Sequence, residues 1–440
     1  MELKVIDMLP GSGKTTSMKQ FIGQMNKSQE TRHFIYLTPY NKGMEEIGYE
    51  IMYNSWTPTQ RLAMSTGEYQ PKDFGNPIPK VPDDVFTKTS SMMRSLKGEQ
   101  NIVCSHELFR LVSQRKKFWE LIQDKHYTLV IDEEIPLEKD YKFEGCYPTD
   151  LKFYLMRSIE GEPPVVSVDE HGVMHWDSTK RDAGKGVFRR LKKDIRTGCL
   201  SYRDGWVRWR IPIEKFEVFD DVYLMTFRFE FSQFKLLWTG DWSYWHFEGD
   251  ELVEGKWQIP QERVDNIRRR VKIADEKCYP QIGKKGHFTY SLAWYQEATP
   301  YDISMLVDRM QYYIKYGAAG KRLDRTKIIW TVFKAYKESI EKWDLGPNHF
   351  RPLRGDVESF IPLNMRASND YLDRNVVFYL VDRYPGGNSP IPKDEWALSE
   401  LLQFLFRTCL RLPDSEEVVY AYIPSERMRR LLERWLDNPV

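Results

Sequence analysis

Cysteine is scarce in this sequence, and long hydrophobic runs are absent. The cysteines are far apart and form no C-x-x-C pair; they are Cys104, Cys146, Cys199, Cys278 and Cys409. This spacing argues against a disulfide framework and against a zinc knuckle, and it favours a reducing cytosol. No apolar run approaches the ~18 residues that a membrane-spanning helix needs, and a strand is predicted at the very start of the sequence, where a signal peptide would lie. We therefore expect a cytoplasmic protein with no membrane partner.

The sequence also lacks an excess of charge of either sign. It has 65 Lys and Arg residues against 64 Asp and Glu residues, a formal net charge of +1. Any binding to a polyanion must therefore depend on local clusters of basic residues. The hydrophobic share of 41% and the charged share of 29% are typical of a globular enzyme. A length of 440 residues suggests two or three domains.

Residues 3–18 contain the strongest functional signal. An apolar strand predicted over 3–6 leads into Leu9-Pro-Gly-Ser-Gly-Lys-Thr15, and a helix is predicted over 15–25. In such a turn the glycines let backbone N–H groups surround a phosphate, the lysine reaches its oxygens and the hydroxyl ligates Mg²⁺. Met8 stands where the strict motif has its first glycine. The residues predicted to bind the nucleotide are Pro10, Gly11, Ser12, Gly13, Lys14, Thr15 and Thr16.

An acidic motif provides the second half of the predicted ATP site. Residues 127–131 are apolar or β-branched and predict a buried strand, which is followed by Asp132-Glu-Glu-Ile135. A phosphate-binding turn needs a carboxylate that holds the metal and a group that orients the attacking water. We expect Asp132 and Thr15 to hold Mg²⁺, and Glu133 and Lys14 to be catalytic.

The order of the predicted elements indicates an α/β protein with parallel sheets. Strands expected over 3–6, 33–37, 101–104 and 127–131 alternate with helices. Residues 146–220 change to short aromatic and β-branched runs, which predict a β-rich inserted subdomain, and 222–226 are expected to return to the main sheet. The expected domains are an N-terminal ATP-binding domain over 1–145 and 221–240, the insertion, and a C-terminal domain over 241–440.

The second half of the chain resumes the alternation of helices and strands. Strands are predicted over 327–331 and 417–422. Helices are predicted over 301–316, 334–343, 370–383 and 396–411, and a further helix ends the chain.

With both motifs in place, the chain resembles the superfamily 2 helicases and translocases, the DExx-box P-loop NTPases. Their first motif is similar to residues 8–15 here, and their DExx box is similar to 132–135. The resemblance covers about 1–140 and 325–415, and it leaves open an origin in a phage or mobile element. It implies two RecA-like domains with parallel sheets, ATP and Mg²⁺ as cofactors, and DNA as a partner. A Q-motif is absent, so recognition of the base is unassigned.

The resemblance also implies contacts to a nucleic-acid strand. Residues 37–42 are similar to motif Ia, 103–106 to motif Ib or Ic, 327–331 to motif IV and 363–369 to motif V, while 224–227 stand in the place of motif III. Asn369 is expected to contact the nucleotide. Helix N-capping is an equally good role for Asn41 and Ser105. The expected nucleic-acid contacts are Thr38, Pro39, Asn41, Ser105, His106, Thr331 and Arg366.

Three polar side chains follow one another at intervals of four residues in the helix expected over 396–411. Gln403, Arg407 and Arg411 would share one helix face and resemble motif VI, which implies that all three are catalytic. We expect one of the arginines to stabilise the γ-phosphate, with Arg407 as the first choice because its spacing from Gln403 matches the family. The alternative is an ordinary solvated face.

Basic and aromatic residues alternate in the expected insertion. Residues 189–193 read Arg-Arg-Leu-Lys-Lys, and 206–210 read Trp-Val-Arg-Trp-Arg. Rings interleaved with cations are typical of a surface that follows a nucleic-acid backbone and stacks bases. The same alternation also predicts an ordinary half-buried strand.

The sequence as a whole favours an ATP-dependent helicase or translocase on single-stranded or partly duplex DNA, acting at a fork with replication partners. Three alternatives stay open: a P-loop kinase, a terminase-like packaging ATPase, and an ATP-gated nucleic-acid clamp. A kinase would leave the last 200 residues or so unexplained. A packaging nuclease would need three or more carboxylates on the later strands, and 327–331 and 417–422 offer no clear set.

Overall fold

The computed structural model describes most of the chain as two compact units. They comprise Met1–Asp7 with Lys14–Trp257, and Met8–Gly13 with Gln258–Val440. The described residues are 2–28, 32–39, 43–56, 59, 61, 81, 87–158, 161–179, 186–280, 289–317, 320, 322–343, 358–363, 365, 369–385 and 391–439.

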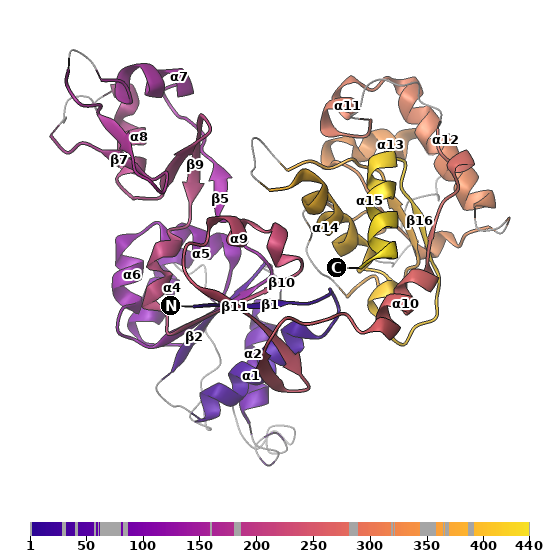
Figure 1. The fold of residues 1–440 in the computed structure, drawn as a ribbon, viewed down its shortest axis with the longest axis horizontal. Helices are drawn as coiled ribbons and strands as arrows, with labels where there is room; N and C mark the ends of the chain where they lie inside the picture. Colours follow the sequence, from indigo (N-terminus) through magenta and orange to yellow (C-terminus); the bar gives the residue numbers. More distant parts are fainter. Residues whose placement is uncertain are drawn as a thin grey trace. The chain divides into compact units, whose positions relative to one another are not determined.

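The first unit is built on a seven-stranded sheet with the strand order β12-β11-β1-β10-β4-β2-β3 (Figure 1). All neighbours pair in parallel except β11 and β12, which form an antiparallel pair. The strands are β1 (Leu3–Asp7), β2 (His33–Thr38), β3 (Ile102–Ser105), β4 (Tyr127–Asp132), β10 (Asp221–Thr226), β11 (Trp242–Glu248) and β12 (Glu251–Glu254). The four predicted N-terminal strands and the predicted return over 222–226 are therefore confirmed.

Helices cover both faces of this sheet, as the nearly continuous apolar runs of its strands require. Leu3, Ile35 and Leu129 point to one face and share a core with α4 (Lys88–Lys97), α5 (His106–Ser113) and α6 (Lys116–Ile122). On the other face α1 (Lys14–Ser28) packs Phe21 against Tyr223 of β10, at 5.7 Å between ring centroids. Helix α2 (Met44–Ser55) packs on α1, and the short helix α9 (Gln233–Leu237) follows β10.

The inserted subdomain has its own sheet and core. Strands β5 (Glu138–Asp140), β9 (Trp206–Arg210) and β8 (Leu200–Arg203) form an antiparallel sheet, and β6 (Val166–Val168) pairs with β7 (Met174–Trp176). Helix α7 (Pro148–Asp150), a single π-helical turn over Leu151–Leu155 and α8 (Arg189–Ile195) complete it (Figure 1). Its apolar core includes Leu151, Leu155 and Met174.

The second unit contains a parallel four-stranded sheet with the order β13-β16-β15-β14. Its strands are β13 (Val271–Ile273), β14 (Ile328–Thr331), β15 (Val376–Tyr379) and β16 (Val419–Tyr422). Its helices are α10 (Gln261–Arg270), α11 (Leu292–Glu297), α12 (Pro300–Tyr316), α13 (Lys337–Trp343), α14 (Lys393–Leu405) and α15 (Glu426–Asp437). Both units are thus α/β with mainly parallel sheets, which confirms the predicted fold class.

Two predictions for this unit were wrong. Residues 370–383 were expected to form a helix, but they contain strand β15. Val376, Val377 and Phe378 are a buried β-branched and aromatic run that pairs between β14 and β16. The helix expected over 396–411 ends at Leu405, and a separate 3₁₀ turn follows over Cys409–Arg411.

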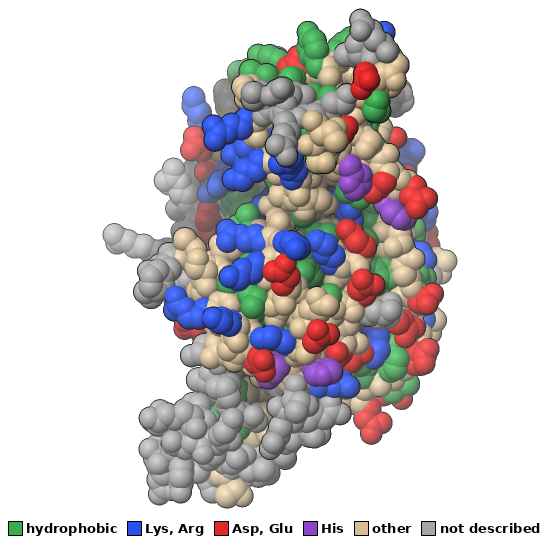
Figure 2. Space-filling model, turned by 90° about the vertical axis from the view of Figure 1, so that its left-hand side faces the viewer, with side chains coloured by type: hydrophobic (Ala, Val, Ile, Leu, Met, Phe, Trp, Pro, Cys, Tyr) green, Lys and Arg blue, Asp and Glu red, His purple; other side chains and the backbone are tan. Residues whose placement is uncertain are grey.

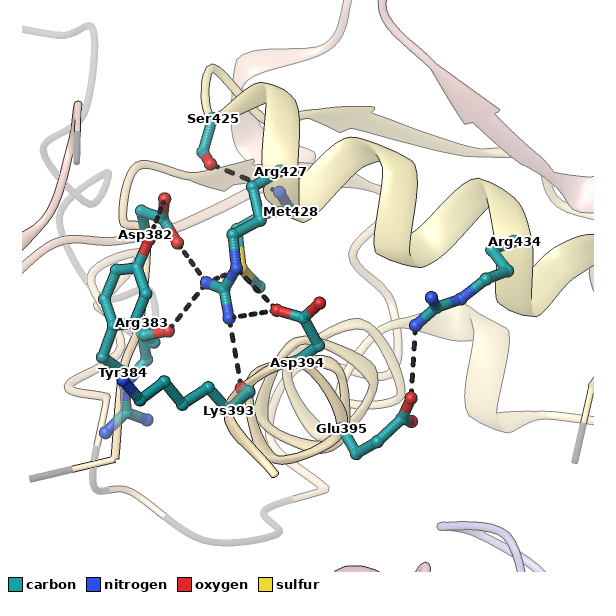
Figure 3. Close-up of polar contacts among 10 residues, drawn as sticks. All are labelled: Asp382, Arg383, Tyr384, Lys393, Asp394, Glu395, Ser425, Arg427, Met428 and Arg434. Carbon is teal, nitrogen blue, oxygen red and sulfur yellow. Dashed lines mark hydrogen bonds and ion pairs between the residues drawn. The ribbon is translucent and has the colours of Figure 1, made fainter. Parts of the chain in front are cut away.

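A polar network ties α14 and α15 to the end of β15 (Figure 3). Arg427 of α15 donates to Asp382, to Asp394 in the first turn of α14, and to the carbonyl oxygens of Arg383 and Lys393. Asp382 is almost completely buried and also accepts from the Tyr384 hydroxyl at 3.2 Å. One guanidinium on α15 therefore satisfies groups from two other segments, which makes this network part of the structural core.

The first sheet continues beyond residue 241, where the sequence predicted the second domain to begin. Strand β11 pairs with β1 through Leu3 and Trp242, and β12 extends the sheet on that side. The division between the compact units falls after Trp257.

Candidate functional site

Four parallel strands end at one edge of the seven-stranded sheet. The last residues of β1, β10, β4 and β2 are Asp7, Thr226, Asp132 and Thr38. The register pairs Asp7 with Thr226, and Met225 with Asp132. Because parallel strands share the direction of their carboxyl ends, polar groups from distant parts of the sequence meet here.

The loop between β1 and α1 makes a tight turn that depends on two glycines. Gly11 and Gly13 have φ angles of 84° and 89°, a region that residues with a β-carbon rarely occupy. The Ser12 N–H donates to the Leu9 carbonyl at 3.2 Å, which closes the turn. Lys14 then begins α1, so the positive end of a 15-residue helix follows the loop directly.

Thr15 and Asp132 are brought together as the sequence predicted for a metal site. The Thr15 hydroxyl donates to Oδ1 of Asp132 at 3.1 Å. The Tyr36 hydroxyl donates to Oδ2 of the same carboxylate at 2.8 Å. A hydroxyl and a carboxylate are the hard oxygen ligands that Mg²⁺ prefers, so these two residues fit the metal that the resemblance implies.

Burial raises the pKa of Asp132 above its ordinary value of 3.8. The hydrogen bonds from Tyr36 and Thr15 lower this pKa, as do the positive charges of Lys19 and Lys14. Lys19 is itself held by an ion pair with Glu50 of α2. The carboxylate therefore lies in a buried environment that favours the binding of a cation.

Glu133 occupies a strained backbone position directly after β4. Its φ angle is 62°, in the left-handed region that non-glycine residues rarely adopt. The carbonyl oxygen of Asp132, in the preceding peptide, lies 3.0 Å from Nε2 of His106, which donates to it. Glu134 accepts from the backbone N–H groups of Gln233 and Phe234 at the start of α9. These contacts on both sides fix the turn that carries Glu133.

Asp7 is a site residue that the sequence analysis missed. Its carboxylate accepts from the backbone N–H groups of Arg228 at 2.7 Å and Phe229 at 2.9 Å. Arg228 has a φ angle of 65°, so the loop after β10 is held in a strained conformation. Burial raises the pKa of Asp7 above 3.8, and the Lys14 charge opposes that shift. A carboxylate directly after the strand predicted over 3–6 was the signal in the sequence.

The expected nucleic-acid contacts in this unit lie near the same edge, with varied surroundings. Thr38 is buried at the end of β2, and Pro39 follows it half-buried. Ser105 caps α5, since its hydroxyl accepts from the Leu108 N–H at 3.3 Å. This confirms the alternative role of Ser105 as a helix N-cap. His106 contacts the Asp132 carbonyl, and Asn41 lies outside the described residues.

The structure separates the three residues expected to share one helix face. Gln403 lies in α14, whereas Arg407 follows the end of that helix and Arg411 lies in the 3₁₀ turn. The helix ends because Thr408 is extended and its hydroxyl accepts from the Leu410 N–H, starting a new turn. The prediction of a common face was therefore wrong.

The two arginines have different environments within the second unit. Arg407 is only 4% exposed, donates to the Met365 carbonyl and packs its guanidinium 5.2 Å from the Phe404 ring centroid. Arg411 lies against Gly11, which belongs to the same unit, so closely that a β-carbon at Gly11 would overlap its side chain.

The remaining predicted residues of this unit are scattered. Thr331 is completely buried at the end of β14, and Asn369 is exposed. Arg366 lies outside the described residues.

Most of the basic and aromatic alternation on β9 is structural. Arg208 is buried and lies 3.3 Å from Glu138, and Trp209 packs against Tyr141. Arg210 pairs with Glu214. The half-buried strand is thus the correct interpretation for these positions, while Trp206 is half exposed.

Two kinds of feature are absent from the described residues. None of the helices placed there is long and apolar enough to cross a membrane. Within the same residues, no group of three or more His, Cys, Asp or Glu side chains is arranged to hold a metal ion. The Thr15 and Asp132 pair is of another kind, since a hydroxyl and a single carboxylate leave the remaining metal positions to phosphate and water.

Comparison with known proteins gives relatives for the whole chain and for its second unit. A family model described as the YonV C-terminal Rossmann-like domain matches residues 265–436. The chain is similar to the SPbeta prophage-derived uncharacterized protein YonV of Bacillus subtilis (strain 168), with 24% identity over 462 residues and 99% of each protein covered.

Two solved structures were also matched, at low similarity. They are crystal structures of the DUF1998 helicase MrfA, one bound to DNA and AMPPNP and one bound to DNA. Each match has 12% identity and a TM-score of 0.37 and covers 99% of this chain. It covers 48% and 49% of the two MrfA chains, so this chain spans about half their length.

Proposed function

We propose that this protein is an ATP-hydrolysing motor that acts on single-stranded or partly duplex DNA. The observation that carries the proposal is the convergence of Thr15 and Asp132 at 3.1 Å, beside a glycine turn and at the carboxyl edge of a parallel sheet. This arrangement supports binding of a nucleoside triphosphate with Mg²⁺, since both ligand types and the anion-binding loop lie in one place.

Each residue has a distinct role in the proposed hydrolysis. The N–H groups of the loop and the Lys14 ammonium hold the β- and γ-phosphates, and Thr15 and Asp132 hold the metal. Mg²⁺, when bound, neutralises charge that develops on the phosphate oxygens. Glu133 orients and polarises the attacking water. Its strained backbone supports this role, because such strain is retained mainly where a side chain must be aimed.

Contacts to the DNA strand would reach the hydrolytic residue through His106. This side chain follows Ser105 at the start of α5 and donates to the Asp132 carbonyl, one peptide before Glu133. A strand held by the first turn of α5 and by Thr38 and Pro39 would therefore bias the position of Glu133. This link supports a motor whose hydrolysis depends on DNA over an ATP-gated clamp that does not turn over.

We assign a transition-state role to an arginine of the second unit. Arg411 is preferred over Arg407, because Arg407 is buried and donates to a backbone carbonyl, whereas Arg411 lies against the glycine turn. Gln403, Asn369, Thr331 and Arg366 remain proposed contacts of the nucleotide or the strand. The proposal also includes two RecA-like lobes and a cytoplasmic location. The protein would act at DNA forks together with replication partners.

The decisive experiment is phosphate release from ATP with and without oligonucleotides. We expect turnover to need Mg²⁺ and to rise when single-stranded or forked DNA is added. Phosphate transfer to a small acceptor without DNA stimulation would identify a kinase. ATP-dependent DNA binding without turnover would identify a clamp, and metal-dependent DNA cleavage would identify a packaging nuclease.

A further inference from the structure

Three aromatic side chains are exposed within eight residues of the inserted subdomain. Tyr147, Phe153 and Tyr154 are 74%, 62% and 63% exposed. Figure 2 shows hydrophobic side chains gathered at the top of this side of the molecule, with Lys and Arg side chains below them. Exposed aromatic rings in a group mark an interaction surface more often than a chance arrangement.

A rigid support holds these rings outward. Leu151 and Leu155, on either side of the exposed run, are almost completely buried in the core of the subdomain. The turn between them is π-helical, a rare conformation that is frequently found at functional sites. With the chain anchored at both ends of the turn, the residues from 152 to 154 point to solvent.

The charges of this segment suit a polyanion. Lys152 and Arg157 are exposed, and neither forms an ion pair within the part of the chain that the structure describes. The nearby carboxylates are engaged: Asp150 accepts from the Tyr147 N–H at 2.7 Å, and Glu144 lies 3.4 Å from Arg190. The cations beside the rings are therefore available to phosphates.

The turn between β8 and β9 extends the same surface. A β-carbon at Gly205 would lie 3.5 Å from Nζ of Lys152, so the two segments are adjacent. Trp206 follows Gly205 and is 50% exposed. Together these side chains form what we call the aromatic surface, which consists of Tyr147, Lys152, Phe153, Tyr154, Arg157 and Trp206.

We propose that the aromatic surface binds unpaired bases of single-stranded nucleic acid. The inference rests on the proposed function, which it deepens by placing a strand contact on the insertion. Rings stack on bases of any sequence, and neighbouring cations hold the phosphates between them. A protein partner is less well matched, because the exposed apolar side chains of the set are all aromatic and cations lie among them.

The test combines a stacking variant with a charge variant of the full chain. Y147S/F153S/Y154S is expected to bind a fluorescein-labelled oligo(dT) at least about tenfold more weakly by fluorescence anisotropy, since each base-ring stack contributes several-fold to affinity. K152E/R157E is expected to reduce the salt dependence of binding, by about 0.7 in log–log slope for each phosphate that the variant no longer neutralises. An oligo(rU) arm distinguishes RNA from DNA as the preferred strand.

A matched control is available in the second unit. Tyr301, in the first turn of α12, is 70% exposed, so Y301S removes a ring of similar exposure. It should leave binding unchanged. Equal melting temperatures of wild type and all variants would show that the folds are intact, as expected for exposed positions.

Measurement of phosphate release distinguishes a failure of this inference from a failure of the proposed function. In the stacking variant, the oligonucleotide concentration for half-maximal stimulation should rise at least about tenfold while maximal turnover is kept. Wild-type binding and stimulation in the stacking variant would overturn the inference and leave the surface to a protein partner. If wild type itself shows no DNA-stimulated turnover, the proposed function fails instead.

Discussion

The phenolic hydroxyl of Tyr36 donates a hydrogen bond to Oδ2 of Asp132 across 2.8 Å, although 96 residues separate them in the sequence. Parallel pairing of β2 and β4 brings them together, since Tyr36 lies opposite Val130. The other carboxylate oxygen of Asp132 accepts from Thr15. Tyr36 thus positions the proposed metal ligand Asp132.

Removal of this hydroxyl should weaken the use of Mg²⁺. In Y36F the carboxylate loses a hydrogen bond worth about 1.5–3 kcal/mol, so DNA-stimulated turnover should fall roughly tenfold or more. The Mg²⁺ concentration for half-maximal phosphate release should rise. Y223F is the matched control, because Tyr223 is buried on the same face and its hydroxyl meets Lys4 at 3.5 Å. An unchanged Mg²⁺ dependence in Y36F would contradict the positioning role.

Substitutions of Lys14 and Glu133 should impair the use of ATP in different ways. K14A should lose both ATP affinity and turnover, whereas E133Q should bind ATP with Mg²⁺ and hydrolyse it at least ~100-fold more slowly. E134Q is the charge-matched control, since its amide oxygen can still accept from Gln233. Nucleotide titration and phosphate release measure the two effects. Full turnover in E133Q would refute the assigned role of Glu133.

The two arginines of the second unit can be separated by activity and stability. R411A should keep ATP affinity and lose ~10³-fold or more of the stimulated rate, as expected for a group that acts on transition-state charge. R407A should mainly lower the melting temperature, because Arg407 is buried and bonded to Met365. The reverse result, a stable inactive R407A beside an active R411A, would restore Arg407 as the catalytic arginine.

The contribution of Asp7 to the stability of the fold should decrease as pH rises through the acidic range. Burial raises its folded pKa above 3.8, so between that value and the folded pKa the folded state binds more protons than the unfolded state. The contribution of Asp7 to the free energy of unfolding is therefore complete below pH ~3.8 and is lost as pH rises through the folded pKa. The melting temperature of wild type minus that of D7N should therefore fall as pH rises over that window. A difference that grows with pH would contradict the shift.

Loss of Arg427 should destabilise the second unit strongly. R427M leaves Asp382, whose side chain is 3% exposed, without its cation, which typically costs about 3–5 kcal/mol. R430M on the same helix is the control, because Arg430 is exposed and its pair with Glu426 should contribute under about 1 kcal/mol. Urea unfolding followed by tryptophan fluorescence compares them. Equal midpoints for the two variants would argue against the network as a structural core.

Local patterns in the sequence were enough to predict much of this protein. The glycine turn with Lys14, the strand ending at Asp132 and the alternation of strands and helices all depend on neighbours in the chain, such as turn chemistry and runs of apolar residues. For that reason the parallel α/β fold, the N-terminal strands and the meeting of Thr15 with Asp132 were predicted correctly.

Tertiary structure decided what depends on partners far apart in sequence. Strand β15 was predicted as part of a helix although its residues are β-branched and aromatic, and its pairing with β14 and β16 decided for the strand. The sequence left two interpretations of Arg208 open, a nucleic-acid contact and a half-buried strand position. The pairing of β5 with β9 decided for the strand, since it brings Glu138 within 3.3 Å of Arg208. Tyr36 and Asp7 carry no motif of their own. Their roles arise only when parallel strands bring a hydroxyl to Asp132 and two backbone N–H groups to Asp7, since hydrogen bonds depend on positions in space.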